Sequence, residues 1–180
     1  MPAIYVSPLR ILPEAFTETR ASHVISLLGP GYMHLCERPD GLDPDRHLRV
    51  HVNDIVEPLP DQVVPAEDHV EQVLSFAGRW DRANPILIHC WAGISRSTAA
   101  AYMTLCQING RGSEHALARM IRRRAPHARP NRLLVALADK ALGRDGAMVE
   151  AVDAMGPAQQ VDIGVLFKLP LAPETESARP

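Results

Sequence analysis

The chain has 180 residues, of which 46% are hydrophobic, and a formal net charge of −2 at pH 7. This length suits one domain with its own core, and the near-neutral charge leaves no basic excess for a nucleic-acid partner. No apolar run is long enough to cross a membrane, and the N-terminus lacks the charged and apolar segments of a secretory signal. Three cysteines are too few for a disulfide framework and suit a reducing compartment. We therefore expect a cytoplasmic protein without a membrane partner.

Short apolar runs predict the strands. Each run is followed by glycine, proline or polar residues that interrupt regular structure. The runs cover residues 3–6, 24–28, 48–52 and 86–88. Residues 161–167 form a fifth run, which we interpret as either a strand or a packing arm. Because helical segments alternate with the strands, we expect an α/β fold with a central mixed, mostly parallel sheet of four to five strands flanked by helices.

Helical periodicity and end signals predict the helices. They cover residues 65–84, 98–108, 113–124, 131–143 and 146–155, and residues 8–18 form a helical or irregular crossing. Ser113 and Asn131 are expected to cap the helices that follow them. Residues 98–108 are apolar nearly all round, which predicts a buried helix. We expect one catalytic domain over residues 1–156, a C-terminal arm over 157–180, and a flexible polar tail from Ala172 onward.

The stretch from Ile86 to Ser97 carries the chemical signal. A strand ends in His89 and Cys90, a loop of five residues follows, and Arg96 opens an alanine-rich helix. Backbone amides of such a loop and the positive end of the next helix hold a phosphate-sized anion. A thiolate beneath the anion can attack phosphorus, and the guanidinium can bind two of its oxygens.

This sequence, Ile-His-Cys-x-x-Gly-x-Ser-Arg-Ser, resembles the phosphate-binding loop of cysteine-dependent protein tyrosine phosphatases, and especially their dual-specificity branch. The resemblance covers about residues 53–109 specifically and weakens toward residue 142. It implies a single phosphatase domain of the bacterial type, with a phosphotyrosine phosphatase-like fold and a phosphocysteine intermediate. It implies no cofactor, and the scattered histidines give no metal site.

The resemblance also implies the roles of individual residues. Cys90 is the nucleophile and Arg96 binds the phosphoryl group. Ser97 stabilises the thiolate in the second step, or serves as a plain helix N-cap. His89 is expected to support the loop by a hydrogen bond, and Asn131 either supports the site or only caps its helix. The amides expected to hold the phosphoryl oxygens belong to Trp91, Ala92, Gly93, Ile94, Ser95 and Arg96.

The leaving group needs a proton donor, for which several carboxylates qualify. Asp54 directly follows a strand, and the pair Asn53-Asp54 resembles the acid-bearing pair of several dual-specificity phosphatases. Asp54 is therefore our first candidate, with a turn-capping role as the alternative. Asp61 is the second candidate. Asp68 is explained more simply by the positive end of its helix.

The loop also bears on the substrate. It contains none of the lysines that relatives acting on inositol phospholipids tend to carry, so we expect a phosphorylated protein or peptide, with phosphotyrosine first and phosphoserine or phosphothreonine next. Tyr32 is a weak candidate for an aromatic clamp. Alternatives are a catalytically silent phosphate-binding module, a phosphatase of a non-protein ester such as an inositol phosphate, and other thiolate chemistry. The oligomeric state is left open.

Three further features have simpler interpretations. Cys106 lies in the apolar helix and is expected in the core. Cys36 is a minor candidate for a disulfide with Cys90 under oxidation. The three arginines 122–124 suit a solvated helix end, which we favour over attraction of substrate.

Overall fold

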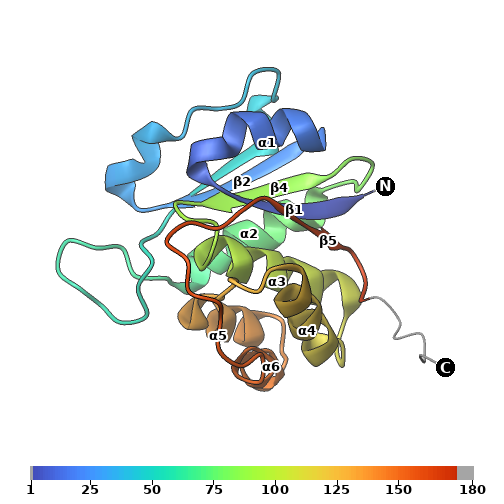
Figure 1. Cartoon of the computed structure of the whole chain (residues 1–180). Helices are drawn as coiled ribbons and strands as arrows, with labels where there is room; N and C mark the ends of the chain where they lie inside the picture. The colour runs from blue at the N-terminus through green and yellow to red at the C-terminus, as the bar shows by residue number, and fades with distance from the viewer. Residues whose placement is uncertain (1, 174–180) are drawn as a thin grey trace.

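The computed structural model describes residues 2–173 and contains one five-stranded sheet in the order β3-β2-β4-β1-β5 (Figure 1). Strands β1 to β4 run parallel, and β5 pairs antiparallel with β1. The strand bounds are Ala3–Pro8 (β1), His23–Leu28 (β2), His47–His51 (β3), Ile86–Cys90 (β4) and Phe167–Pro170 (β5). The predicted α/β fold with a mixed, mostly parallel sheet is confirmed.

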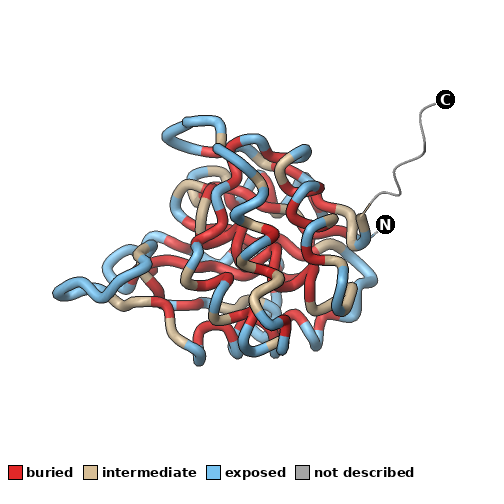
Figure 2. The backbone as a smooth tube through the Cα atoms, turned by 90° about the horizontal axis from the view of Figure 1, so that it is seen from below, coloured by how far each residue is buried: buried red, intermediate tan, exposed pale blue. Residues whose placement is uncertain are grey.

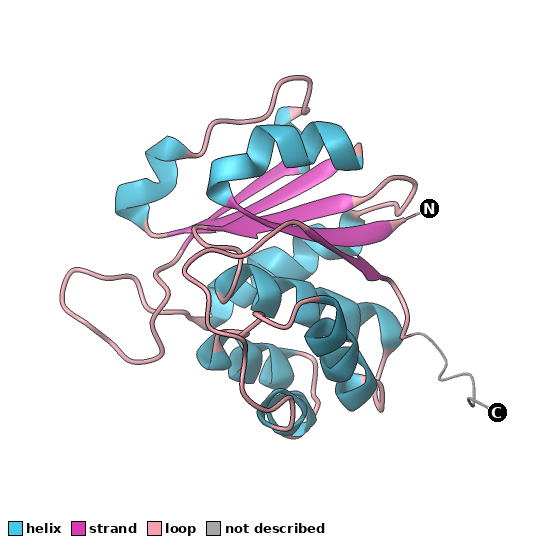
Figure 3. Cartoon of the chain, in the orientation of Figure 1, coloured by secondary structure: helices cyan, strands magenta, loops and turns pink. Residues whose placement is uncertain are grey.

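Helices cover the two faces of the sheet unequally. Helix α1 (Leu12–Thr19) lies on one face, and the other helices lie together on the opposite face (Figures 1 and 3). These are α2 (Glu67–Arg79), α3 (Arg96–Asn109), α4 (Glu114–Arg124), α5 (Arg132–Ala141) and α6 (Ala147–Asp153). The short 3-10 helices η1 (Leu9–Ile11), η2 (Pro30–Leu35) and η3 (Pro44–Arg46) complete the elements.

The central strands are apolar on both faces because both faces are covered. In β2, Ile25 and Leu27 join the large core under α2 to α6, whereas Val24 and Leu28 join a smaller core under α1. Figure 2 shows buried residues through the middle of the molecule and an exposed projecting loop. The C-terminal ends of β2, β3 and β4 meet at one edge, where parallel sheets usually bind ligands.

Two expectations about the ends of elements need correction. The fifth strand is Phe167–Pro170, later than residues 161–167, because Phe167 and Leu169 are the side chains that alternate into the core. Ser113 precedes α4 but does not cap it, since its hydroxyl donates backward to the carbonyl of Gly110. The predicted flexible tail, beyond residues 172 and 173, lies outside the described residues.

Candidate active site

In the loop between β4 and α3, four backbone carbonyl groups accept hydrogen bonds from residues outside the loop. The carbonyls of Trp91, Ala92, Ile94 and Ser95 accept hydrogen bonds from Leu9, Gly164, Arg129 and Ala99, respectively. Within residues 2–173, the amides of residues 92–96 donate to no acceptor. Because the carbonyl groups bond to residues outside the loop, the amide groups remain free to bind an anion inside it. Three of these donors, Leu9, Arg129 and Gly164, come from widely separated parts of the chain.

Gly93 is required by the shape of this loop. Its φ is +70°, a left-handed conformation that disfavours other residues. A Cβ atom at this position would lie 2.7 Å from the backbone nitrogen of Pro8 and 2.8 Å from the carbonyl carbon of Ser7. Both obstacles are backbone atoms of β1, so they cannot move aside cheaply. The glycine therefore lets the loop rest directly on the neighbouring strand.

Cys90 lies at the floor of the loop and is 1% exposed. Its Sγ is 3.1 Å from the Oγ of Ser97, the second residue of the following helix α3. Helix α3 begins at Arg96 with Ser95 at the N-cap position, so the alternative of Ser97 as a plain N-cap is wrong. The Ser97 hydroxyl is instead completely buried beside the thiol.

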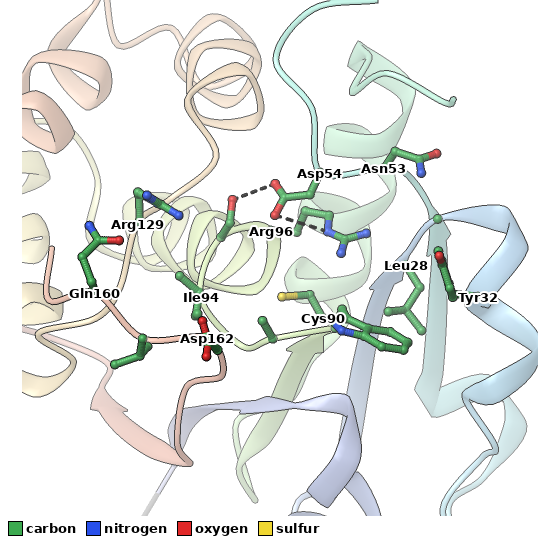
Figure 4. Close-up of a pocket in the computed structure, with 15 residues that line it drawn as sticks. Leu28, Tyr32, Asn53, Asp54, Cys90, Ile94, Arg96, Arg129, Gln160 and Asp162 are labelled. Carbon is green, nitrogen blue, oxygen red and sulfur yellow. Dashed lines mark hydrogen bonds and ion pairs between the residues drawn. The ribbon is translucent and has the colours of Figure 1, made fainter. Parts of the chain in front are cut away.

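Arg96 and Asp54 meet above the thiol (Figure 4). The Arg96 Nη1 donates to the carbonyl of Val52 over 2.8 Å, and its Nε lies 4.0 Å from Oδ2 of Asp54. Asp54 Oδ1 accepts a hydrogen bond from the Ser95 hydroxyl at 2.7 Å. The carboxyl group is thus held at the mouth of the loop by groups of the loop itself.

Solved structures resemble this arrangement at low sequence identity. DUSP15 matches with a TM-score of 0.55 and 22% identity over 86% of this chain and 91% of that chain. A mouse putative dual specificity phosphatase complexed with zinc tungstate gives 0.55 and 21%, over 87% of this chain and 89% of that chain. The chain has the dual-specificity phosphatase fold. Tk-PTP shares it, with a TM-score of 0.51 and 23% identity over 79% of this chain and 92% of that chain. No family model and no curated protein matches the sequence.

Within this dual-specificity phosphatase fold, Asn131 joins the site to α5. Its Oδ1 accepts a hydrogen bond from the amide of Leu134, which confirms the predicted cap. Its Nδ2 donates to Asp54 Oδ1 at 2.9 Å and to the carbonyl of Ile55 at 3.2 Å. One side chain therefore both begins the helix and holds the carboxyl group.

The segment before Asn131 is held by an arginine that was expected to be solvated. Arg122 donates to the carbonyls of Pro126, Ala128, Met155 and Gly156. The solvated-end interpretation is wrong for this residue because its guanidinium replaces missing backbone hydrogen bonds in the turn after α4. Arg122 thereby fixes the start of the segment that reaches the loop.

His89 directly precedes the loop, and its side chain lies on the face of the sheet that α1 covers. It is fully buried, its Nε2 lies 2.6 Å from the Oγ of Ser26, and burial lowers its pKa to about 3. A neutral, buried imidazole fits the expected structural role better than proton transfer to a substrate.

An open pocket of about 670 Å³ surrounds the thiol (Figure 4). Asp54 lines it, whereas Asp61 lies in the exposed loop between β3 and α2 and does not. Sequence reasoning missed three polar residues of the rim, Arg129, Gln160 and Asp162, because they come from segments without a motif. Trp91 and Tyr32 form the other rim, with ring centroids 5.1 Å apart.

The remaining expectations concern cysteines, metals and membranes. Cys106 is buried in the core as predicted, and Cys36 is a free thiol with its Sγ 3.5 Å from Nε2 of His89. Among residues 2–173, no group of three or more His, Cys, Asp or Glu side chains is arranged to hold a metal ion. No helix in that range combines the length and apolarity needed to span a membrane.

Proposed function

We propose that this chain is a protein phosphatase that hydrolyses phosphate monoesters through a phosphocysteine on Cys90. One observation carries the proposal: the buried thiol lies below five loop amides that have no acceptor within the described residues. These amides, the N-terminus of α3 and Arg96 would together bind the oxygens of a phosphoryl group above the thiol. The unit carrying this activity is residues 1–156, acting in the reducing cytoplasm, with the arm from residue 157 closing one rim.

In the first step, the Cys90 thiolate attacks phosphorus in line with the leaving group. A sulfur–phosphorus bond forms while the bond from phosphorus to the leaving oxygen breaks. The loop amides and Arg96 bind the equatorial oxygens, where charge is concentrated in the transition state. Asp54, as the carboxylic acid, gives its proton to the leaving oxygen. Its position at the mouth of the loop supports this role, and Asn131 and Ser95 hold it there.

In the second step, the Asp54 carboxylate takes a proton from water. The water oxygen attacks phosphorus, the sulfur–phosphorus bond breaks, and inorganic phosphate and the thiolate are released. The Ser97 hydroxyl, 3.1 Å from Sγ, donates a hydrogen bond to this leaving thiolate. The two steps return Asp54 to its acid form and Cys90 to its thiolate form.

A phosphotyrosine residue in a protein or peptide is the substrate that fits best. Tyr32 is 53% and Trp91 is 46% exposed at the rim, an unusual exposure for two aromatic rings in contact. A phenyl ring attached to the bound phosphate would pack against them, which an alkyl phosphate cannot do. Activity on phosphoserine and phosphothreonine is the dual-specificity version of the same proposal.

Turnover of a phosphotyrosine peptide by the wild type and variants tests the proposal. Cys90→Ser and Arg96→Ala should abolish turnover, whereas Arg119→Ala, an exposed arginine on α4, should leave it unchanged. Turnover that survives Cys90→Ser would contradict the phosphocysteine mechanism. Phosphate binding by the wild type without turnover on any ester would favour a silent binding module. A clear preference for inositol phosphates over the peptide would overturn the proposed substrate.

A further inference from the structure

A second basic cleft lies at the edge strand β3, outside the candidate active site. Its volume is about 440 Å³, and it is lined by Arg38, Pro44, His47 and Arg49. None of the lining residues is acidic. Arg49 donates to the carbonyl of Cys36, and the Arg38 guanidinium has no hydrogen bond or ion pair within the described residues. Two guanidinium groups beside an imidazole match the charge and hydrogen-bonding capacity of a phosphate group.

A row of polar side chains joins this cleft to the phosphate-binding loop. His47, Ser26, His89 and Ser7 belong to β3, β2, β4 and β1, and alternation along the strands places them on the face covered by α1. The Oγ of Ser26 is 2.8 Å from Nε2 of His47 and 2.6 Å from Nε2 of His89. A continuous hydrogen-bonded path therefore leads from the cleft to the residue before Cys90.

The far end of this row carries an unsatisfied polar atom. Ser7 Oγ is buried without a hydrogen-bond partner within the described residues, and the ring of His89 has a backbone hydrogen bond with Cys90. Ser7 is also the residue whose carbonyl carbon lies against Gly93. Burying polar atoms at the centre of a sheet costs stability, so a row of them calls for an explanation beyond packing.

We propose that the cleft of Arg38, His47 and Arg49 is a second phosphate-binding site, whose occupancy is relayed through Ser26 to His89. The Ser26 hydroxyl has one proton and donates it to only one of the two imidazoles. The site does not depend on the catalytic activity proposed above. Its ligand is a phosphate group, carried by a protein or free in solution.

The relay follows from charge. Burial, Arg49 and Arg38 together lower the pKa of His47 to about 4, so its ring is neutral near pH 7. A bound phosphate opposes the two guanidinium charges and favours protonation of His47. Protonated His47 donates from Nε2 to Ser26, and Ser26 then donates to Nε2 of His89. His89 then accepts from Ser26 at Nε2, while its ring keeps the backbone hydrogen bond with Cys90.

Nitrogen NMR of the full chain tests the second site and the relay. The histidine and tryptophan side chains are labelled, and inorganic phosphate is titrated at pH 7. The His47 and His89 signals should shift together, as Ser26 changes the imidazole to which it donates. In Arg38→Gln, the His47 response should need about tenfold more phosphate, because one charge-assisted hydrogen bond is lost. Arg119→Gln is the matched control and should behave as wild type. The Trp91 indole reports phosphate binding in the catalytic loop independently.

Ser26→Ala separates binding from relay: the His47 response should remain and the His89 response should disappear. A His47 signal that stays still while Trp91 responds would overturn the site. A His89 response equal to wild type in Arg38→Gln would overturn the relay, since it would then follow the catalytic loop alone. If Ser26→Ala does not fold, Arg38→Gln alone tests the proposal, because Arg38 is exposed and its substitution should not disturb the fold. Tighter binding of a phosphoserine peptide than of inorganic phosphate would assign the ligand to a protein, and the reverse would assign it to free phosphate.

Discussion

At the scale of single residues, hydrogen bonds hold the side chains of Cys90 and Asp54 in place, whereas the loop amides have no acceptor within residues 2–173. Cys90 and Ser97 are buried together, while Asp54 is anchored by Ser95 and Asn131 at the mouth of the loop. The proposed nucleophile is thus buried at the floor of the loop, and the proposed acid lies at its mouth. This separation makes the roles of the residues testable one at a time.

Asp54→Asn should slow hydrolysis by an amount that depends on the leaving group. With phenyl phosphate, whose leaving oxygen needs a proton, we expect kcat to fall about 10²–10⁴-fold, the usual contribution of a general acid. With p-nitrophenyl phosphate, whose leaving group departs without one, the loss should be much smaller. Asp61→Asn is the control and should leave both rates unchanged. Equal losses on the two substrates, or a loss in the control, would show that the acid is wrongly assigned.

Asn131→Asp separates the cap from the contact with Asp54. The new carboxylate still accepts from the amide of Leu134, so the cap is kept. The buried side chain loses the two hydrogen bonds that Nδ2 donates, so the free energy of unfolding should fall by about 1–3 kcal/mol. It places like charge beside Asp54 in place of an amide donor, which favours the protonated acid, so the alkaline limb of the pH profile of kcat/KM should move to higher pH. Urea unfolding and the pH–rate profile measure the two effects. An unchanged profile would mean that Asn131 does not act on Asp54 and is only a cap.

At the scale of elements, the loop depends on segments that follow it in the chain. The residue Gly164 in the C-terminal arm bonds the carbonyl of Ala92, and Arg129, before α5, bonds that of Ile94. Strand β5 attaches the arm to the edge of the sheet through its pairing with β1. We infer that the arm positions the rim residues Gln160 and Asp162 as well as closing the sheet.

Leu169→Ala should weaken this attachment. Leu169 is completely buried, and removing a buried leucine side chain costs about 2–5 kcal/mol in the free energy of unfolding. Because the arm also carries part of the pocket rim, KM for a phosphopeptide should rise. Val165→Ala, on a residue 61% exposed in the same arm, is the control and should change stability by less than about 0.5 kcal/mol. An unchanged unfolding curve for Leu169→Ala would show that β5 contributes little.

Local sequence predicted the parts of this site that lie in one contiguous stretch. The loop, its thiol and its arginine share a strand–loop–helix pattern, and apolar runs predicted the four parallel strands. The rim residues Arg129, Gln160 and Asp162 were missed because only tertiary packing brings their segments to the loop. Arg122 was misread since a run of arginines at a helix end looks the same whether it is solvated or bonded to carbonyls.

At the scale of the whole molecule, buried imidazoles link stability to pH. Burial is the largest cause that lowers the pKa of His89 to about 3 and that of His47 to about 4, from an ordinary value of 6.5. At a pH between 6.5 and the lowered pKa, each of these histidines binds a proton in the unfolded chain but not in the folded chain. Stability should therefore fall as the pH is lowered from about 6.5 to 4, by up to about 1.4 kcal/mol per pH unit for each histidine.

Urea unfolding between pH 7 and 4.5 measures this slope. His47→Asn should reduce it, because one of the two buried sites no longer takes up a proton on unfolding. His51→Asn, on an exposed residue of the same strand, should not change it. A slope that is the same in the His47 variant and the wild type would contradict the account of the buried row.

The phosphoenzyme itself gives the most direct test of the proposed function. Wild type is mixed rapidly with a 32P-labelled phosphotyrosine peptide and quenched within one turnover, and the labelled chain is digested and sequenced. We predict that the label is on Cys90, and that it persists longer in Ser97→Ala because the leaving thiolate is less stabilised. Turnover without any covalent label, or a label on another residue, would contradict the phosphocysteine mechanism.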